Sequence, residues 1–192
     1  MPNNTINFFR MPAEWESHSA VWLAWPYDLV TFGSLNEKNN EINKNRIDKV
    51  EEVFVKIINE LSESEKVKLI TRDGNADFRI KDKVEIFKAD YADVWTRDYM
   101  PSFVKNNNGN IIAIKWIYNA YGEKFSGLVK DNNVWTEINK KLNIDTIETN
   151  LLMESGAIDV NGGGVLLTTE QCLLSRNPNL DKKTIEDIFV KN

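Results

Sequence analysis

Apolar residues in the first half of the chain recur with two different spacings. The run at residues 20–25 is short, rich in tryptophan and closed by Pro26, which predicts a buried strand. Between residues 47 and 61 the apolar positions lie three or four apart with polar residues between them, which predicts a helix with one packed face. Apolar runs at residues 67–71 and 84–89 predict two further strands. This half therefore predicts an α/β fold.

From Met100 onward the pattern indicates hairpins. Two apolar segments, residues 101–105 and 111–117, flank a turn whose glycine and asparagines tolerate the positive φ of a tight reversal. A helix at about residues 131–142 and a strand at residues 145–152 are predicted to follow.

The order of hairpin and helix then starts again. The turn glycines Gly109 and Gly163 are 54 positions apart, and repetition at such an interval predicts an architecture of repeated modules. No strand follows the last predicted helix, so we expect the second copy to be incomplete in this chain. Its predicted elements are a strand at residues 157–160, a turn at 161–164, a strand at 165–169 and a helix at 181–190.

Composition narrows the class of protein. Hydrophobic residues make up 42% and charged residues 28% of the chain, which is typical of a globular protein. The net charge is -5 and no basic cluster is present, which argues against a nucleic-acid partner. The sequence has neither a signal-peptide pattern nor an apolar segment of membrane-spanning length. Its single cysteine excludes an internal disulfide, so we expect a cytoplasmic location without membrane attachment.

Four groups of motifs occur in order along nearly the whole chain. They are RMPAEWE at 10–16 with AWP at 24–26, DVWTRDYMP at 93–101, WIYNAYG at 116–122, and ESG at 154–156 with DVNG at 159–162 and LLTTEQCLL at 166–174. Together these motifs resemble the agmatine deiminase family. That resemblance implies a pentein fold, an α/β-propeller in which five ββαβ-type modules surround a substrate tunnel. The chain would hold a little over two of the five modules, and residues 1–192 would be the N-terminal part of one catalytic domain whose C-terminal half is absent.

The implied reaction explains why carboxylates are needed. A guanidinium carbon is a poor electrophile, so the planar cation must be held by paired hydrogen bonds while a strong nucleophile reaches its face. The resemblance implies a cysteine nucleophile assisted by a histidine, with agmatine and water giving N-carbamoylputrescine and ammonia in putrescine biosynthesis. It implies no cofactor. The segments that carry the catalytic histidine and cysteine are not present in these residues, so we expect this fragment alone to be inactive.

Asp98 is the strongest candidate for binding substrate, because it matches the aspartate that grips the guanidinium in the family. From spacing alone it could equally cap turn amides. Trp95 could line the tunnel as a second substrate-binding residue, or it could be a buried core tryptophan. Arg97 could support Asp98 through an internal ion pair, or it could be an ordinary surface arginine.

Glu154 corresponds to a glutamate that orients the catalytic histidine, and its alternative is a surface carboxylate at a strand end. Asn119 resembles a supporting residue near the site. Asp93 and Asp159 lie near these motifs, but strand alternation or a turn accounts for both.

Cys172 is predicted to be structural, an unactivated thiol within an apolar and buried strand-like stretch at residues 166–174. The only histidine, His18, is a poor candidate for its general base. One histidine and one cysteine cannot form a closed zinc site.

Two alternatives stay open from the sequence. The same motifs occur in bacterial-type peptidylarginine deiminases, so the guanidine compound could be peptidyl-arginine. A chain of this length could also act as a non-catalytic module that binds a guanidine or a partner. In that case an uncovered flank would favour self-association into a homo-oligomer.

Overall fold

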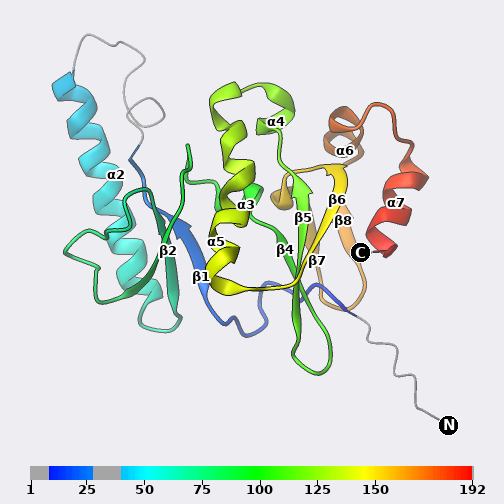
Figure 1. The fold of residues 1–192 in the computed structure, drawn as a ribbon, viewed down its shortest axis with the longest axis horizontal. Helices are drawn as coiled ribbons and strands as arrows, with labels where there is room; N and C mark the ends of the chain where they lie inside the picture. The colour runs from blue at the N-terminus through cyan, green and yellow to red at the C-terminus, as the bar shows by residue number, and fades with distance from the viewer. Residues whose placement is uncertain (1–8, 28–39, 192) are drawn as a thin grey trace. The chain divides into compact units, whose positions relative to one another are not determined.

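The computed structural model describes residues 9–27 and 40–191 and divides the chain into two compact units (Figure 1). One unit comprises Ser17–Thr96 and Thr136–Ile138, and the other comprises Met1–Glu16, Arg97–Trp135 and Asn139–Asn192. The unit Ser17–Thr96 contains one sheet and the other unit contains two, and each unit is described separately.

The unit Ser17–Thr96 has strand–helix–strand order. Its strands β1 (Val21–Ala24), β2 (Val67–Thr71) and β3 (Val84–Lys88) form a parallel sheet in the order β1-β2-β3, in which Val67 is paired with both Val21 and Val84. Helix α2 (Asn40–Leu61) links the first two strands. Its Ile58 is fully buried with Leu69 in one apolar cluster. These elements confirm the strands and the helix predicted from the apolar spacing.

The second unit includes most of a single helical turn, α3 (Thr96–Tyr99), and the predicted hairpin of β4 (Ser102–Lys105) and β5 (Ile111–Ile117). Helix α5 (Val134–Leu142) then leads to β6 (Thr146–Leu152), which pairs in parallel with β5 and completes a three-stranded sheet. The segment 102–152 therefore has the predicted ββαβ order. Between β5 and α5 lie two short elements that the sequence pattern did not predict, α4 (Ala120–Glu123) and the 3-10 helix η1 (Ser126–Asn133).

A second hairpin follows, with β7 (Ile158–Val160) antiparallel to β8 (Leu166–Thr168) after the 3-10 turn η2 (Ser155–Ala157). Helices α6 (Glu170–Arg176) and α7 (Lys182–Lys191) close the described chain. One apolar cluster joins both copies of the repeat. Its buried members come from β4, β5 and the end of β6 in the first copy and from β7, α6 and α7 in the second. They include Ile114, Trp116, Leu151, Met153, Ile158, Leu173 and Ile185.

Two local predictions are wrong. Residues 166–174 are not one strand-like stretch, because β8 ends at Thr168 and the Thr169 hydroxyl accepts a hydrogen bond from the Cys172 amide (3.3 Å), which caps α6. Residues 131–133 belong to η1, so the α-helix begins only at Val134. In the second turn the left-handed backbone lies at Gly162 and Gly164.

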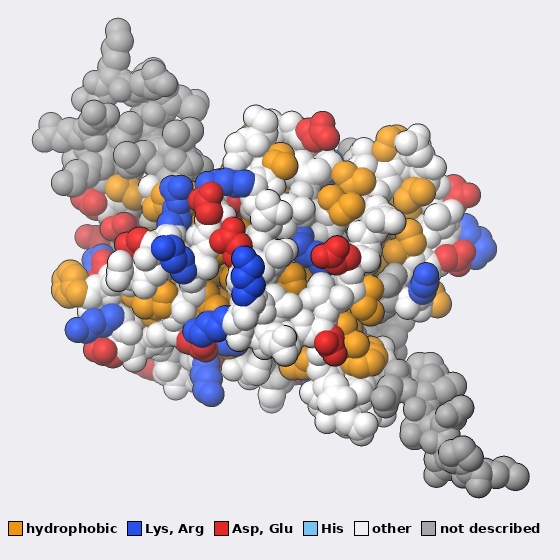
Figure 2. Space-filling model, viewed as in Figure 1, with side chains coloured by type: hydrophobic (Ala, Val, Ile, Leu, Met, Phe, Trp, Pro, Cys, Tyr) orange, Lys and Arg blue, Asp and Glu red, His pale blue; other side chains and the backbone are white. Residues whose placement is uncertain are grey.

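Charged side chains of both signs are interspersed over the face drawn in Figure 2, so that face carries no continuous basic surface. Among the described residues, no helix has both the length and the apolar character that crossing a bilayer requires.

Candidate functional site

Asp98 lies on α3, at the start of the first hairpin, and its side chain is half-buried. The Tyr121 hydroxyl donates a 2.6 Å hydrogen bond to its Oδ2. Its Oδ1 lies so close to Gly156 that a methyl group added at that glycine would be 2.3 Å away. The carboxylate therefore points into its own unit, between α4 and η2, and not into bulk water.

The environment raises the pKa of Asp98. Burial is the main cause, because it disfavours the charged carboxylate, and the negative charge of Glu154 acts in the same direction. The hydrogen bond from Tyr121 and the positive charge of Arg97 oppose the shift. Asp98 and Glu154 thus lie near enough for the charge of Glu154 to affect the pKa of Asp98.

Glu154 follows β6 and is 5% exposed, so its interpretation as a surface carboxylate is wrong. Arg176 Nε donates a 2.9 Å hydrogen bond to its Oε1, and that arginine is itself largely buried. Its other oxygen, Oε2, accepts a 3.5 Å contact from the Cys172 thiol. The ion pair with Arg176 holds the Glu154 carboxylate in one orientation, so it can in turn orient a hydrogen-bond donor placed beside it.

Cys172 lies on α6, and not in a strand as predicted from its apolar neighbours. Burial is the largest cause that raises the pKa of its thiol, and the charge of Glu154 adds to the effect. Because a nucleophilic cysteine must be a thiolate, this environment suits an unactivated thiol. Its structural role stays a prediction. His18 belongs to the other unit, where its Nδ1 lies 3.2 Å from Glu65 Oε2.

Asn119 supports the backbone of α4. Its side-chain oxygen accepts a 2.9 Å hydrogen bond from the Gly122 amide, and its carbonyl accepts a 2.7 Å bond from the Glu123 amide. The residue thus stabilises the turn that carries Tyr121, and its role as a support of the site stays a prediction.

Asp93 and Trp95 belong to the unit Ser17–Thr96. Asp93 is buried, and its two oxygens accept hydrogen bonds from the Val94 amide (2.7 Å) and the Trp95 indole (3.0 Å). Trp95 is 52% exposed, so its interpretation as a buried core residue is wrong. Its role in lining a tunnel stays a prediction.

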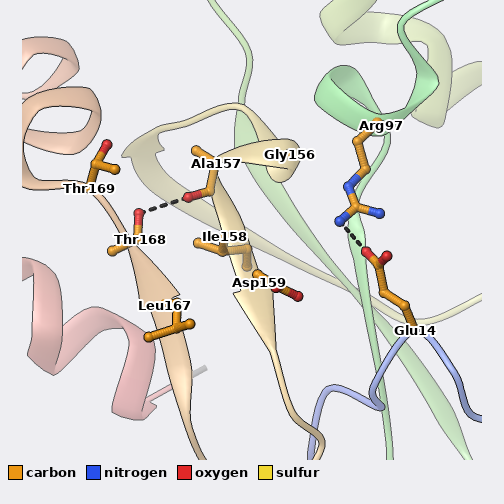
Figure 3. Close-up of a pocket in the computed structure, with 9 residues that line it drawn as sticks. All are labelled: Glu14, Arg97, Gly156, Ala157, Ile158, Asp159, Leu167, Thr168 and Thr169. Atoms are coloured by element: carbon orange, nitrogen blue, oxygen red, sulfur yellow. Dashed lines mark hydrogen bonds and ion pairs between the residues drawn. The ribbon is translucent and has the colours of Figure 1, made fainter.

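Arg97 combines features of both interpretations, because its largely exposed side chain forms an ion pair with Glu14. This pair borders a shallow pocket of about 370 Å³ (Figure 3). Asp159 also lines it, and its Oδ1 accepts a bond from the Val160 amide. The floor of the pocket includes Gly156, the residue that touches Asp98. The remaining lining residues are Ala157, Ile158, Leu167, Thr168 and Thr169.

Among the described residues, no group of three or more histidine, cysteine, aspartate or glutamate side chains is arranged to hold a metal ion. The cluster around Asp98 and Glu154 contains their two carboxylates, the phenols of Tyr118 and Tyr121, and the guanidinium of Arg176. These groups suit recognition of a small planar cation.

The family model for Porphyromonas-type peptidyl-arginine deiminases matches residues 10–192. The chain belongs to that family.

Agmatine deiminases are prominent among the relatives of this deiminase-family chain. A Mycoplasma capricolum protein named as an agmatine deiminase is 32% identical over 188 residues, covering 93% of this chain and 49% of the relative. A solved agmatine deiminase of Enterococcus faecalis superposes with a TM-score of 0.79 at 28% identity, covering 94% of this chain and 49% of the other. The C315S agmatine deiminase of C. jejuni, solved with substrate bound, gives 0.77 at 26% identity, covering 96% and 53%.

These neighbours bear out the predicted α/β pentein class of the chain, which spans about half the length of the curated relatives it matches. Sequence reasoning missed three residues of the candidate site: Tyr121, Gly156 and Arg176. Tyr121 and Gly156 lie inside recognised motifs. Arg176 lies four residues after Cys172, a spacing that places both on one face of a helix once α6 is known.

Proposed function

We propose that residues 1–192 are the N-terminal part of one pentein catalytic domain of an agmatine-hydrolysing deiminase. The reaction would convert agmatine and water to N-carbamoylputrescine and ammonia, as a step toward putrescine. The observation that carries the proposal is the convergence of Asp98 and Glu154 in one partly buried cluster formed by the motifs of this family. Scattered surface carboxylates would not support it.

In this proposal Asp98 binds the guanidinium of agmatine. A planar guanidinium presents parallel N–H groups that match the two oxygens of a carboxylate, and such charge-assisted bonds are stronger than neutral ones. Each carboxylate oxygen has two lone pairs, so Oδ2 can accept from substrate while it still accepts from Tyr121. Trp95 is proposed to line the substrate path, with Arg97 and Asn119 as supports.

Glu154 is proposed to orient the catalytic histidine. Its ion pair with Arg176 compensates the buried charge and leaves the carboxylate able to accept from an imidazole N–H. A carboxylate in this position fixes the tautomer of the histidine and steadies its protonated form.

The nucleophile and the histidine are proposed to come from the half of the relatives that this chain does not cover. Cys172 is a poor nucleophile, because its pKa is raised and its nearest polar partner is a carboxylate. The 192 residues alone should therefore bind the substrate but not turn it over.

The names of the relatives favour agmatine over peptidyl-arginine. The matched proteins of M. capricolum, E. faecalis and C. jejuni all carry the agmatine deiminase name. The family model is named for peptidyl-arginine deiminases, so peptidyl-arginine is the second candidate substrate.

A binding experiment on the 192-residue chain tests the proposal. Agmatine is titrated into labelled protein and followed by NMR, with Asp98→Asn as the test variant. Asp187→Asn on α7 is the control, because that exposed carboxylate pairs only locally with Lys183. Loss of charge-assisted bonds should weaken agmatine binding at least about tenfold in Asp98→Asn and leave the control unchanged.

Three further measurements make the outcome specific. Putrescine, which lacks the guanidinium, should not perturb the Asp98 resonances. Tighter binding of an acyl-arginine amide than of agmatine would favour the second substrate. Equal agmatine affinity in Asp98→Asn and the wild type would refute the proposed binding role, and formation of N-carbamoylputrescine by the chain alone would refute its predicted inactivity.

A further inference from the structure

The turn at α4 has an unusual backbone. Four successive residues, Ala120, Tyr121, Gly122 and Glu123, have φ values of 55°, 62°, 78° and 62°. Only glycine adopts the left-handed region without steric cost, so the other three conformations persist only where the surroundings impose them. Such clusters of strained residues occur preferentially at functional sites.

Contacts from three directions impose this conformation. Asn119 accepts from the Gly122 amide through its side chain. The Arg176 guanidinium covers Gly122 so closely that an added methyl group would lie 3.0 Å from its Nη1. The Tyr121 ring packs edge-on against Tyr118 (5.6 Å between centroids) and Phe125 (6.1 Å).

The result of this arrangement is the placement of one hydroxyl. The strained turn directs Tyr121 Oη to Asp98 Oδ2 at 2.6 Å, across 23 positions of sequence. On the other side, Gly156 leaves room for Oδ1 only because it has no side chain. The carboxylate is thus confined between a donor and a backbone surface.

We propose that Tyr121 is a positioning residue for Asp98, which fixes the orientation of the carboxylate and keeps it ionised for the guanidinium. The inference rests on the proposed binding role of Asp98 and extends it to a residue that does not itself need to touch the substrate. Its physical basis is that a hydrogen bond donated to a carboxylate favours the charged form.

Other charged and titratable groups around Asp98 also affect its ionisation, in addition to the hydrogen bond from Tyr121. Glu154 and burial favour the protonated acid, and Arg97 favours the carboxylate. Cys172 and Tyr118 face the same region; burial is the main cause that raises the pKa of each, and the Asp98 charge adds to it. Burial, and the bond to Asp98, raise the pKa of Tyr121, so its phenol stays protonated and able to donate at neutral pH.

The test variant is Tyr121→Phe, which keeps the ring and removes the hydroxyl. The pKa of Asp98 is measured from the pH titration of its carboxyl 13C resonance in the 192-residue chain. Loss of the bond should raise that pKa by about one unit. Agmatine affinity should fall about tenfold at a pH below both the wild-type and the variant pKa of Asp98 and recover toward the wild-type value as the pH rises above them.

Tyr91→Phe is the matched control. The Tyr91 side chain is more deeply buried than that of Tyr121, and its hydroxyl donates to the Trp25 carbonyl (2.6 Å) within the unit Ser17–Thr96. Its loss should lower stability without changing the titration of Asp98. A purely structural role for Tyr121 would give the same result as this control.

Site-specific replacement of Tyr121 by 3-fluorotyrosine covers the case in which Tyr121→Phe does not fold. A more acidic phenol is a stronger donor, so the pKa of Asp98 should fall. An unchanged Asp98 pKa in both variants would overturn the inference while leaving the binding role of Asp98 intact. A shifted pKa in a chain that does not bind agmatine at any pH would support the positioning role and refute the proposed function.

Discussion

Replacement of Gly156 by alanine should disturb the candidate site more than any change of similar size nearby. The added methyl group would lie 2.3 Å from Asp98 Oδ1 and 3.0 Å from Arg97 Cγ. Favourable contacts between such atoms begin near 3.5 Å, so the carboxylate must move by about 1 Å. That movement distorts the 2.6 Å hydrogen bond that the Tyr121 hydroxyl donates to Oδ2.

The magnitude follows from three effects. Overpacking of a filled site costs about 1–3 kcal/mol of folding free energy. Loss of a hydrogen bond to a charged group costs about 2 kcal/mol. Alanine restricts the unfolded chain and returns at most about 1 kcal/mol. The costs exceed the gain, so we expect a net destabilisation of about 3 kcal/mol together with weaker agmatine binding.

Gly127→Ala provides the matched control, because no atom lies within 4 Å of the added methyl group and neither glycine has a left-handed φ. Urea denaturation of both variants measures the free energy of unfolding, and the 13C titration of Asp98 reports the displaced carboxylate. If Gly156→Ala were as stable as Gly127→Ala and the pKa of Asp98 were unchanged, the close packing of Asp98 against η2 would be refuted.

Two further predictions concern buried charges. Glu154→Gln removes the negative charge that adds to burial in raising the pKa of Cys172, so the thiol should react several-fold faster with a thiol reagent at pH 8. The same substitution leaves Arg176 unpaired, which should destabilise the fold by about 3 kcal/mol. An unchanged rate of thiol reaction in the folded variant would contradict the first effect. Burial lowers the pKa of Lys115 from 10.5 to about 8, so the unfolded chain binds more protons between these values and stability should rise with pH across that window. Relative to Lys115→Met, the wild type should gain on the order of 3 kcal/mol between pH 7 and pH 11 in urea denaturation, and a pH-independent difference would refute the buried amine.

The elements with strong periodicity could be read from the sequence. The helix α2 and the strands β2, β4 and β5 carry enough apolar positions in a fixed spacing for local pattern to determine their type. The short elements could not be found in this way. Helices α3 and α4 have four residues each, which is about one turn and too few for a helical period to be recognised.

Helix α6 shows how one local signal can override another. Its apolar residues extend the pattern of β8, which favoured a strand, but Thr169 begins a helix by accepting from the Cys172 amide. Because α6 begins directly after Thr169, Cys172 and Arg176 lie on one helix and Arg176 pairs with Glu154. A strand predicted to run through residue 174 therefore gave no indication of this ion pair.

Motif order, composition and local period thus determined the family, the α/β class and the importance of Asp98 and Glu154 as candidates. Only the tertiary structure decided what surrounds them. Tyr121 lies 23 positions from Asp98 and Arg176 lies 22 positions from Glu154. Contacts across such separations depend on which strand ends and turns the folded sheet brings together, and hydrophobic periodicity carries no information about that meeting.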